Sequence, residues 1–99
     1  MIRGTTPTLE FMLPFDASAL SDAYITIVQG RKVVLEKCLG DCECTSECLR
    51  VRLTQDETLM LNCKCRVEIQ IRAKTITGDA IASDIITVDV ERILKDGVI

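Results

Sequence analysis

Histidine and tryptophan are absent from this chain of 99 residues, and aromatic side chains make up only 3% of it. Without histidine, neither a Ser-His-Asp triad nor a Cys-His nucleophile pair can be built. The sequence also lacks the P-loop, G-x-G-x-x-G and H-E-x-x-H motifs of nucleotide-binding and zinc-dependent enzymes. These absences favour a protein that is not an enzyme, with a core built mainly from isoleucine, valine and leucine.

Long apolar runs and a strong net charge are missing as well. No stretch approaches the roughly 18 consecutive apolar residues of a membrane span, and the opening MIRGTTPTLEF has no apolar signal-peptide core. The formal charge of −3 gives no general attraction to nucleic acid or to an acidic membrane surface. We therefore expect synthesis in the bacterial cytoplasm, and neither nucleic acid nor a membrane as a partner.

What is present is an alternation of apolar and polar residues with a period of two, which is typical of strands with one buried face. It is clearest over Cys63–Thr75, where Val67, Ile69 and Ile71 are expected to point inward. In Ile81–Val90, the inward set is Ile86, Val88 and Val90. The same alternation predicts further strands over Thr8–Pro14, Ala23–Gln29, Lys32–Leu39 and Leu49–Leu53.

Short turn and helix signals separate these strands. Gly30-Arg31 predicts a tight turn, and Thr77-Gly78-Asp79 predicts a hairpin turn. Thr54–Glu57 has the spacing of a capping box and predicts one helical turn, and Asp16–Asp22 favours another. About seven strands without a long amphipathic helix predict an all-β fold, an antiparallel Ig-like β-sandwich that forms one domain over residues 1–99.

Six cysteines lie between positions 38 and 65: Cys38, Cys42, Cys44, Cys48, Cys63 and Cys65. The two C-x-C pairs could supply four thiolates to a zinc ion, from Cys42, Cys44, Cys63 and Cys65, with Cys38 and Cys48 as further candidate ligands. Strand geometry argues against this metal site. Residues i and i+2 of a strand lie about 6.8 Å apart, whereas sulfurs on one zinc ion approach to roughly 3.8 Å.

Disulfides and free thiols are the other two states left open for these cysteines. Cross-strand disulfides that join a cysteine of the segment 38–48 to Cys63 or Cys65 are geometrically reasonable. A cytosolic protein, however, keeps its thiols reduced unless it later leaves the cell. A reduced cysteine behaves as a small hydrophobe and is often buried. From parity with their strand neighbours, we expect Cys63 and Cys65 to be core residues and Cys48 to be exposed.

Two further features allow both a functional and an ordinary interpretation. Six basic residues form a stripe able to contact phosphates if their strands are neighbours, and are simply solvated otherwise: Arg50, Arg52, Lys64, Arg66, Arg72 and Lys74. The segment 93–99 carries four apolar residues, Ile93, Leu94, Val98 and Ile99. This tail either packs on its own domain or docks on a neighbouring subunit.

Several sequence phrases together carry a family resemblance. These are Gly4–Thr8 with the following Leu9, Phe11 and Leu13–Asp16, then Leu53–Leu59, Val67–Arg72 and Arg92–Ile99. They resemble small prophage-encoded Ig-like β-sandwich proteins of Firmicutes, which are associated with phage tail or baseplate genes. The similarity spans nearly the whole chain, and it departs from the family at most cysteine positions, where other members have apolar or polar residues.

The resemblance implies a non-enzymatic structural or interaction module, a virion component of the tail or baseplate. Its implied partners are proteins, either a second copy of the chain or other virion subunits. One alternative is a thiolate metal-binding module that uses the two C-x-C pairs. A second alternative is an adhesion or glycan-binding domain, although few aromatic residues are available to stack on sugar rings.

Overall fold

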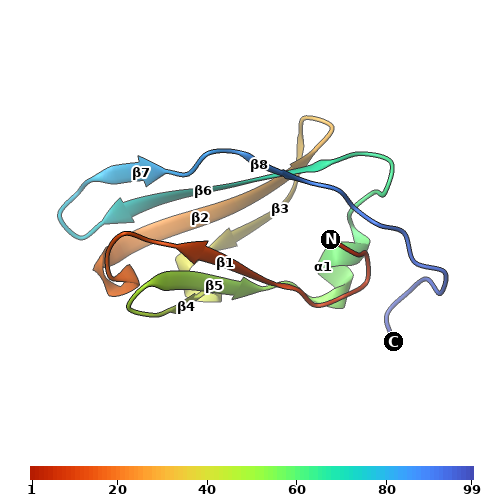
Figure 1. Cartoon of the computed structure of the whole chain (residues 1–99), viewed down its shortest axis with the longest axis horizontal. Helices are drawn as coiled ribbons and strands as arrows, with labels where there is room; N and C mark the ends of the chain where they lie inside the picture. Colours follow the sequence, from red (N-terminus) through yellow and green to blue (C-terminus); the bar gives the residue numbers. More distant parts are fainter.

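Eight strands form two antiparallel sheets in the computed structural model, which describes all 99 residues (Figure 1). Strands account for 46% of the chain and helices for 11%, which confirms the all-β prediction. The smaller sheet has the order β1-β5-β4, and the larger has the order β3-β2-β6-β7, with β8 also pairing with β6. The strands are β1 (Thr8–Met12), β2 (Leu20–Gln29), β3 (Lys32–Cys38), β4 (Glu43–Cys44), β5 (Cys48–Arg52), β6 (Val67–Thr75), β7 (Ala80–Ala82) and β8 (Ile86–Val88).

A single cluster of 13 buried residues takes side chains from both sheets. The smaller sheet and the residue after it contribute Leu49, Val51 and Leu53, as their alternation predicted. The larger sheet contributes the inward residues of β2 and β6, among them Ile25, Ile27, Val67, Ile69 and Ile71. Burial of this aliphatic surface, at about 25 cal/mol per Å², is the main force that holds the two sheets together.

The register between β2 and β6 decides which side chains share a face. Ile25 lies opposite Ile71 on the core side, and the next outward pair is Tyr24 opposite Arg72. Because directly opposed residues of an antiparallel pair point to the same face, the outward residues of β2 stand beside those of β6. This places a row of polar side chains on the outer face of the larger sheet.

Three short helices connect the strands: η1 (Ala17–Ala19), η2 (Leu39–Asp41) and α1 (Gln55–Leu59). The predicted capping box of α1 is confirmed. The Glu57 amide donates to Thr54 Oγ1 at 3.2 Å, and the Thr54 amide donates to Glu57 Oε1 at 2.8 Å. The helical turn expected within Asp16–Asp22 is η1, whose cap Asp16 accepts from the Ser18 amide. None of these helices has the length and hydrophobicity needed to cross a membrane.

Chain connections set which edges of the two sheets lie on the same side. On one side, η2 carries the chain directly from β3, an edge of the larger sheet, to β4, an edge of the smaller one. On the opposite side, the Arg3 amide donates to the Glu91 carbonyl and the Glu91 amide to the Met1 carbonyl, so the N-terminal segment runs beside the chain that follows β8. In Figure 1 the N-terminus lies near the segment that follows β8, while the C-terminus lies farther away.

The single strand predicted over Ile81–Val90 is two strands, β7 and β8, and this corrects the sequence-based expectation. Between them, Ser83 bonds to Ile71 of β6, with its amide donating to the Ile71 carbonyl and its hydroxyl accepting from the Ile71 amide. Val90 is buried and Val88 half-buried, but Ile86 is 50% exposed. Ile86 stands opposite the buried Ile69, on the core side of the sheet, in a strand that pairs with β6 alone.

Candidate functional site

Three of the six cysteines lie where the chain crosses from β3 to β4. The Cys38 thiol donates to Asp41 Oδ2 at 3.3 Å, and the Cys42 thiol donates to the Cys38 carbonyl at 3.3 Å. Burial against the core raises the pKa of Cys42 to about 11, and the nearby charges of Cys44, Asp41 and Cys38 add to the effect. The raised pKa makes the thiolate of Cys42, which is the nucleophilic form, rarer at neutral pH than the thiolate of an ordinary cysteine.

Cys48 is only 4% exposed, so the prediction that it is exposed was wrong. Its parity does match the exposed Arg50 and Arg52, but the turn between β4 and β5 folds over it. Thr45 Oγ1 accepts from the Cys48 amide at 3.0 Å and lies 3.2 Å from the Cys48 sulfur. A side chain at the first position of a strand is thus covered by its own hairpin turn.

Cys63 and Cys65 are exposed, so the prediction that they are core residues was also wrong. They precede β6, which begins only at Val67, and their apparent parity with the β6 core residues has no structural meaning. The loop that carries them is held by the buried Gln29. The Gln29 side-chain amide donates to the carbonyls of Asn62 and Cys65 at 2.6 and 3.0 Å, and its oxygen accepts from the Asn62 amide at 2.7 Å.

The structure does not gather the predicted zinc ligands Cys42, Cys44, Cys63 and Cys65. The first pair lies at η2 and β4, and the second lies in the loop between α1 and β6. No group of three or more cysteine or carboxylate side chains is placed to hold a metal ion. All six cysteines are free thiols, so none of the cross-strand disulfides considered above is formed. The zinc site remains a prediction that this geometry does not support.

The six basic residues do not form one stripe. Arg50 and Arg52 belong to β5 in the smaller sheet, whereas Arg72 and Lys74 belong to β6 in the larger. Several of these cations already have partners, because Arg50 pairs with Glu10 at 3.0 Å and Arg66 with Asp89 at 2.9 Å. The solvated interpretation fits these residues, with the exception of the two on the outer face of β6.

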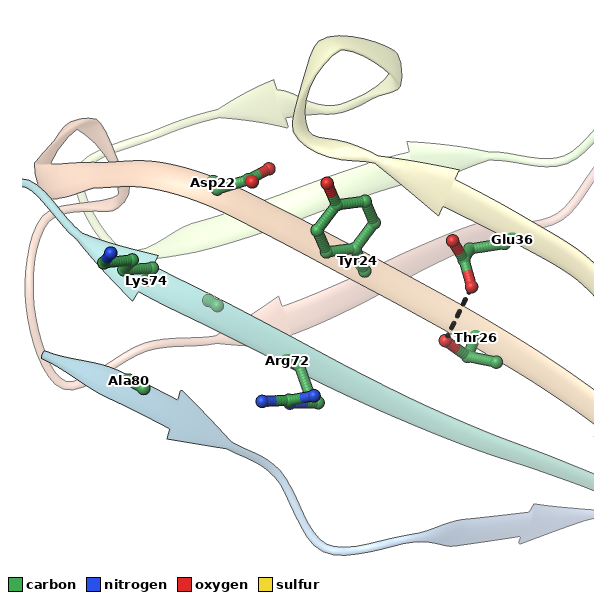
Figure 2. Close-up of a pocket in the computed structure, with 8 residues that line it drawn as sticks. Asp22, Tyr24, Thr26, Glu36, Arg72, Lys74 and Ala80 are labelled. Carbon is green, nitrogen blue, oxygen red and sulfur yellow. Dashed lines mark hydrogen bonds between the residues drawn. The ribbon is translucent and has the colours of Figure 1, made fainter. Parts of the chain in front are cut away.

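A hollow of about 420 Å³ lies on the outer face of the larger sheet (Figure 2). Its acidic residues come from β2 and β3, its basic residues come from β6, and an aromatic ring lies between the acids. The lining residues are Asp22, Tyr24, Thr26, Glu36, Arg72, Ala73, Lys74 and Ala80. The sequence alone does not reveal this site, because nothing in the local pattern shows that β6 pairs with β2.

Tyr24 is the centre of this hollow and is 45% exposed. The neighbouring carboxylate of Asp22 raises the pKa of the Tyr24 hydroxyl above its usual value, with smaller contributions from burial, Cys38 and Glu36. Thr26 donates to Glu36 at 3.5 Å. None of the four charged residues of the hollow takes part in an ion pair, since the four ion pairs of the molecule involve other residues.

The free edge formed by β7 and β8, called here the β7–β8 edge, is apolar. Both strands pair with β6 on one side only. The exposed isoleucines along this edge are Ile81 of β7, Ile86 of β8 and Ile85, which directly precedes β8. The opposite edge of the same sheet, β3, has Lys37 pointing inward and a bulge opposite the Ile27–Val28 step. Inward charges and bulges block the pairing of an edge strand with another chain. The isoleucines of the β7–β8 edge give no such protection.

Only one of the four apolar residues of the tail, Ile93, packs on its own domain. Ile93 is half-buried, and a Cβ atom placed on Gly4 would lie only 2.9 Å from it, so this residue packs on its own domain. Leu94, Val98 and Ile99 are exposed. The end of the chain is held by its backbone, because the Ile99 amide donates to Gln55 Oε1 at 2.9 Å and Gln55 Nε2 donates back to the Ile99 carbonyl at 3.2 Å.

The features above are the candidate functional surfaces of the chain: a charged hollow around Tyr24, an apolar sheet edge, and an exposed apolar tail. Comparison with known proteins found no matching family model, no matching curated protein and no matching solved structure.

Proposed function

We propose that this chain is a non-enzymatic structural module of a phage-derived particle, an Ig-like β-sandwich of the tail or baseplate. It works by associating through its β7–β8 edge with a second copy of itself. The sequence phrases that resemble prophage-encoded Ig-like proteins support the phage origin. The two-sheet architecture is consistent with that family, and the hydrophobic sheet edge supports the mode of action.

One observation carries the association: the two edges of the larger sheet are built differently. The β3 edge carries a bulge and an inward lysine, which discourage the addition of another strand. Ile85 and Ile86 of the opposite edge are 58% and 50% exposed, next to backbone groups that no strand pairs. Pairing two such edges would satisfy these backbone groups and remove the isoleucines from water.

Sedimentation velocity over a wide range of protein concentrations tests this association. We expect the wild-type chain to form dimers or larger assemblies and Ile86→Lys to weaken association by about tenfold, since a buried lysine opposes pairing. Val33→Lys is the matched control, because Val33 is 61% exposed at the opposite edge, on β3. A chain that stays monomeric throughout, or a control that weakens association as strongly as Ile86→Lys, would rule out the β7–β8 edge as the interface.

The particle assignment needs a separate measurement. Mass spectrometry of purified phage particles, released by the strain that encodes this chain, should detect it at the copy number of a tail or baseplate protein. Recovery of the chain only from the cell lysate, and never from the particles, would contradict the virion role while leaving the self-association result intact.

A further inference from the structure

We propose that the hollow around Tyr24 binds a zwitterionic ligand in which an organic ammonium group is joined to a phosphate. Ala80 of β7 is the one residue of the β7–β8 edge in its lining. The charged and aromatic side chains of the hollow come from β2, β3 and β6 and point away from the core, whereas Ile81 and Ile86 stand on the core-facing side of the sheet. The inference therefore does not depend on the proposed self-association.

The distribution of charge across the hollow suggests a ligand with two unlike ends. Figure 2 shows Asp22 and Glu36 on either side of Tyr24, with Arg72 and Lys74 together on β6. Asp22 and Lys74 are cross-strand partners, yet no ion pair forms between them or between any other acid and base of the hollow. The two carboxylates and the two basic groups balance, so a ligand that carries both an ammonium and a phosphate group complements the site better than either group alone.

The acidic half fits an organic cation. An exposed tyrosine ring attracts a cation through the negative face of its π-system, and two carboxylates beside the ring add a direct electrostatic attraction. Tyr24 supplies the ring, and Asp22 and Glu36 supply the carboxylates. An ammonium or quaternary ammonium group placed over the ring would be attracted by all three groups.

The basic half fits a phosphate. Arg72 and Lys74 stand two positions apart on one strand, about 6.8 Å along it, and point to the same face. A guanidinium binds two oxygens of a phosphate at once, and an ammonium adds a point charge, so a tetrahedral phosphate can accept from both. Ala80 on the neighbouring strand is small and leaves room for the group. The hollow, about 420 Å³, matches the size of small-molecule sites.

The chain offers a direct probe of this site. Tyr24 is the only tyrosine and tryptophan is absent, so intrinsic fluorescence excited in the tyrosine band reports on the hollow alone. Titration of the full chain with phosphocholine should give a saturable change in this fluorescence. The same ligand should shift the backbone amide resonances of Asp22–Thr26 and Arg72–Lys74 in an NMR spectrum.

Three further titrations separate the parts and the source of the ligand. Choline alone and inorganic phosphate alone should each bind at least about tenfold more weakly than phosphocholine, because each satisfies only half of the site. Phosphatidylcholine vesicles test the lipid source: binding to vesicles and to the free ligand supports a lipid headgroup, and binding to the free ligand alone supports a soluble one. Binding to vesicles without binding to the free ligand would overturn the proposal.

Substitutions at each end complete the test. Arg72→Gln and Asp22→Asn should each weaken phosphocholine binding by about tenfold, and the matched surface controls Arg52→Gln and Asp84→Asn should leave it unchanged. Urea unfolding curves of each variant check that the fold is kept. The proposal fails if phosphocholine gives no saturable change, if choline or phosphate alone binds as tightly, or if the variants of the hollow bind like the wild type.

Discussion

Lys37 of β3 points into the molecule and forms an ion pair with Glu57 of α1, with side chains that are only 14% and 17% exposed. Glu57 has a second role, since it also accepts from the Thr54 amide to complete the capping box. One carboxylate thus fastens the start of the helix and ties it to an edge strand of the larger sheet. The inward lysine also protects that edge from pairing with another chain.

Removal of either partner of this ion pair should lower the free energy of unfolding. We expect Glu57→Gln to cost about 1–3 kcal/mol, since it leaves a mostly buried ammonium unpaired while a glutamine oxygen keeps the capping interaction. Lys37→Met should cost a similar amount. Urea unfolding of both single variants and the double variant measures the coupling. Single losses that add up in the double variant would show that the two side chains do not interact.

The same pair predicts a pH dependence. Burial raises the pKa of Glu57, but hydrogen bonds from Lys37 and from the Thr54 amide, together with the Lys37 charge, outweigh it and hold the pKa below 4.5, the ordinary value. A lowered pKa in the folded state contributes stability that is complete above the unfolded pKa and is lost as pH falls through the folded pKa.

The stability difference between wild type and Glu57→Gln should therefore be constant near neutral pH and should shrink as pH falls below about 4.5. Unfolding curves at a series of pH values measure this difference directly. Hydrogen bonds at the carboxyls of Asp16 and Asp41 lower the pKa of each group as well. Both proteins, the wild type and Glu57→Gln, should therefore lose further stability at acid pH, and this loss cancels in the difference between them. A difference that grows in acid would contradict the assignment.

The thiols should divide into fast and slow groups. Cys38, Cys44, Cys63 and Cys65 are exposed and should react quickly with a disulfide reagent at pH 8, whereas the buried Cys48 should react only on unfolding. With a pKa of about 11, Cys42 has a thiolate fraction roughly 100-fold below that of an ordinary thiol. Mass mapping of modified peptides over time gives each rate. Slow modification of Cys63 and Cys65 would mean that their loop is buried after all.

The backbone of the tight turn between β2 and β3 is strained at Arg31, and a glycine there should relieve the strain. Gly30 and Arg31 both have positive φ values, of 56° and 65°, and only glycine adopts this conformation without a steric cost. Arg31→Gly should raise the free energy of unfolding by about 0.5–1 kcal/mol, and Gly30→Ala should lower it by about 1 kcal/mol although no atom lies within 4 Å of the added methyl group. Thermal unfolding checks both signs, and a stabilising Gly30→Ala would exclude backbone strain as the cause.

Elements that depend on neighbouring residues alone were predicted well from the sequence. The inward faces of β5 and β6, the Gly30-Arg31 turn and the capping box at Thr54 all follow from periodicity and local hydrogen bonding. The cysteines were predicted poorly. The parity rule holds only inside a strand, and Cys63 precedes its strand while Cys48 lies under its own hairpin turn.

The sequence by itself determined an all-β chain with aliphatic inner faces, because the alternation of side chains along a strand is a local property of the backbone. Only the tertiary structure decided which strands are neighbours. The pairing of β2 with β6 created the charged hollow by bringing Tyr24 beside Arg72, and the position of β7 and β8 left isoleucines at a free edge. The contact between Lys37 and Glu57 has the same origin. These contacts join residues far apart in the chain, and the choice of partner is made by the packing of the whole core.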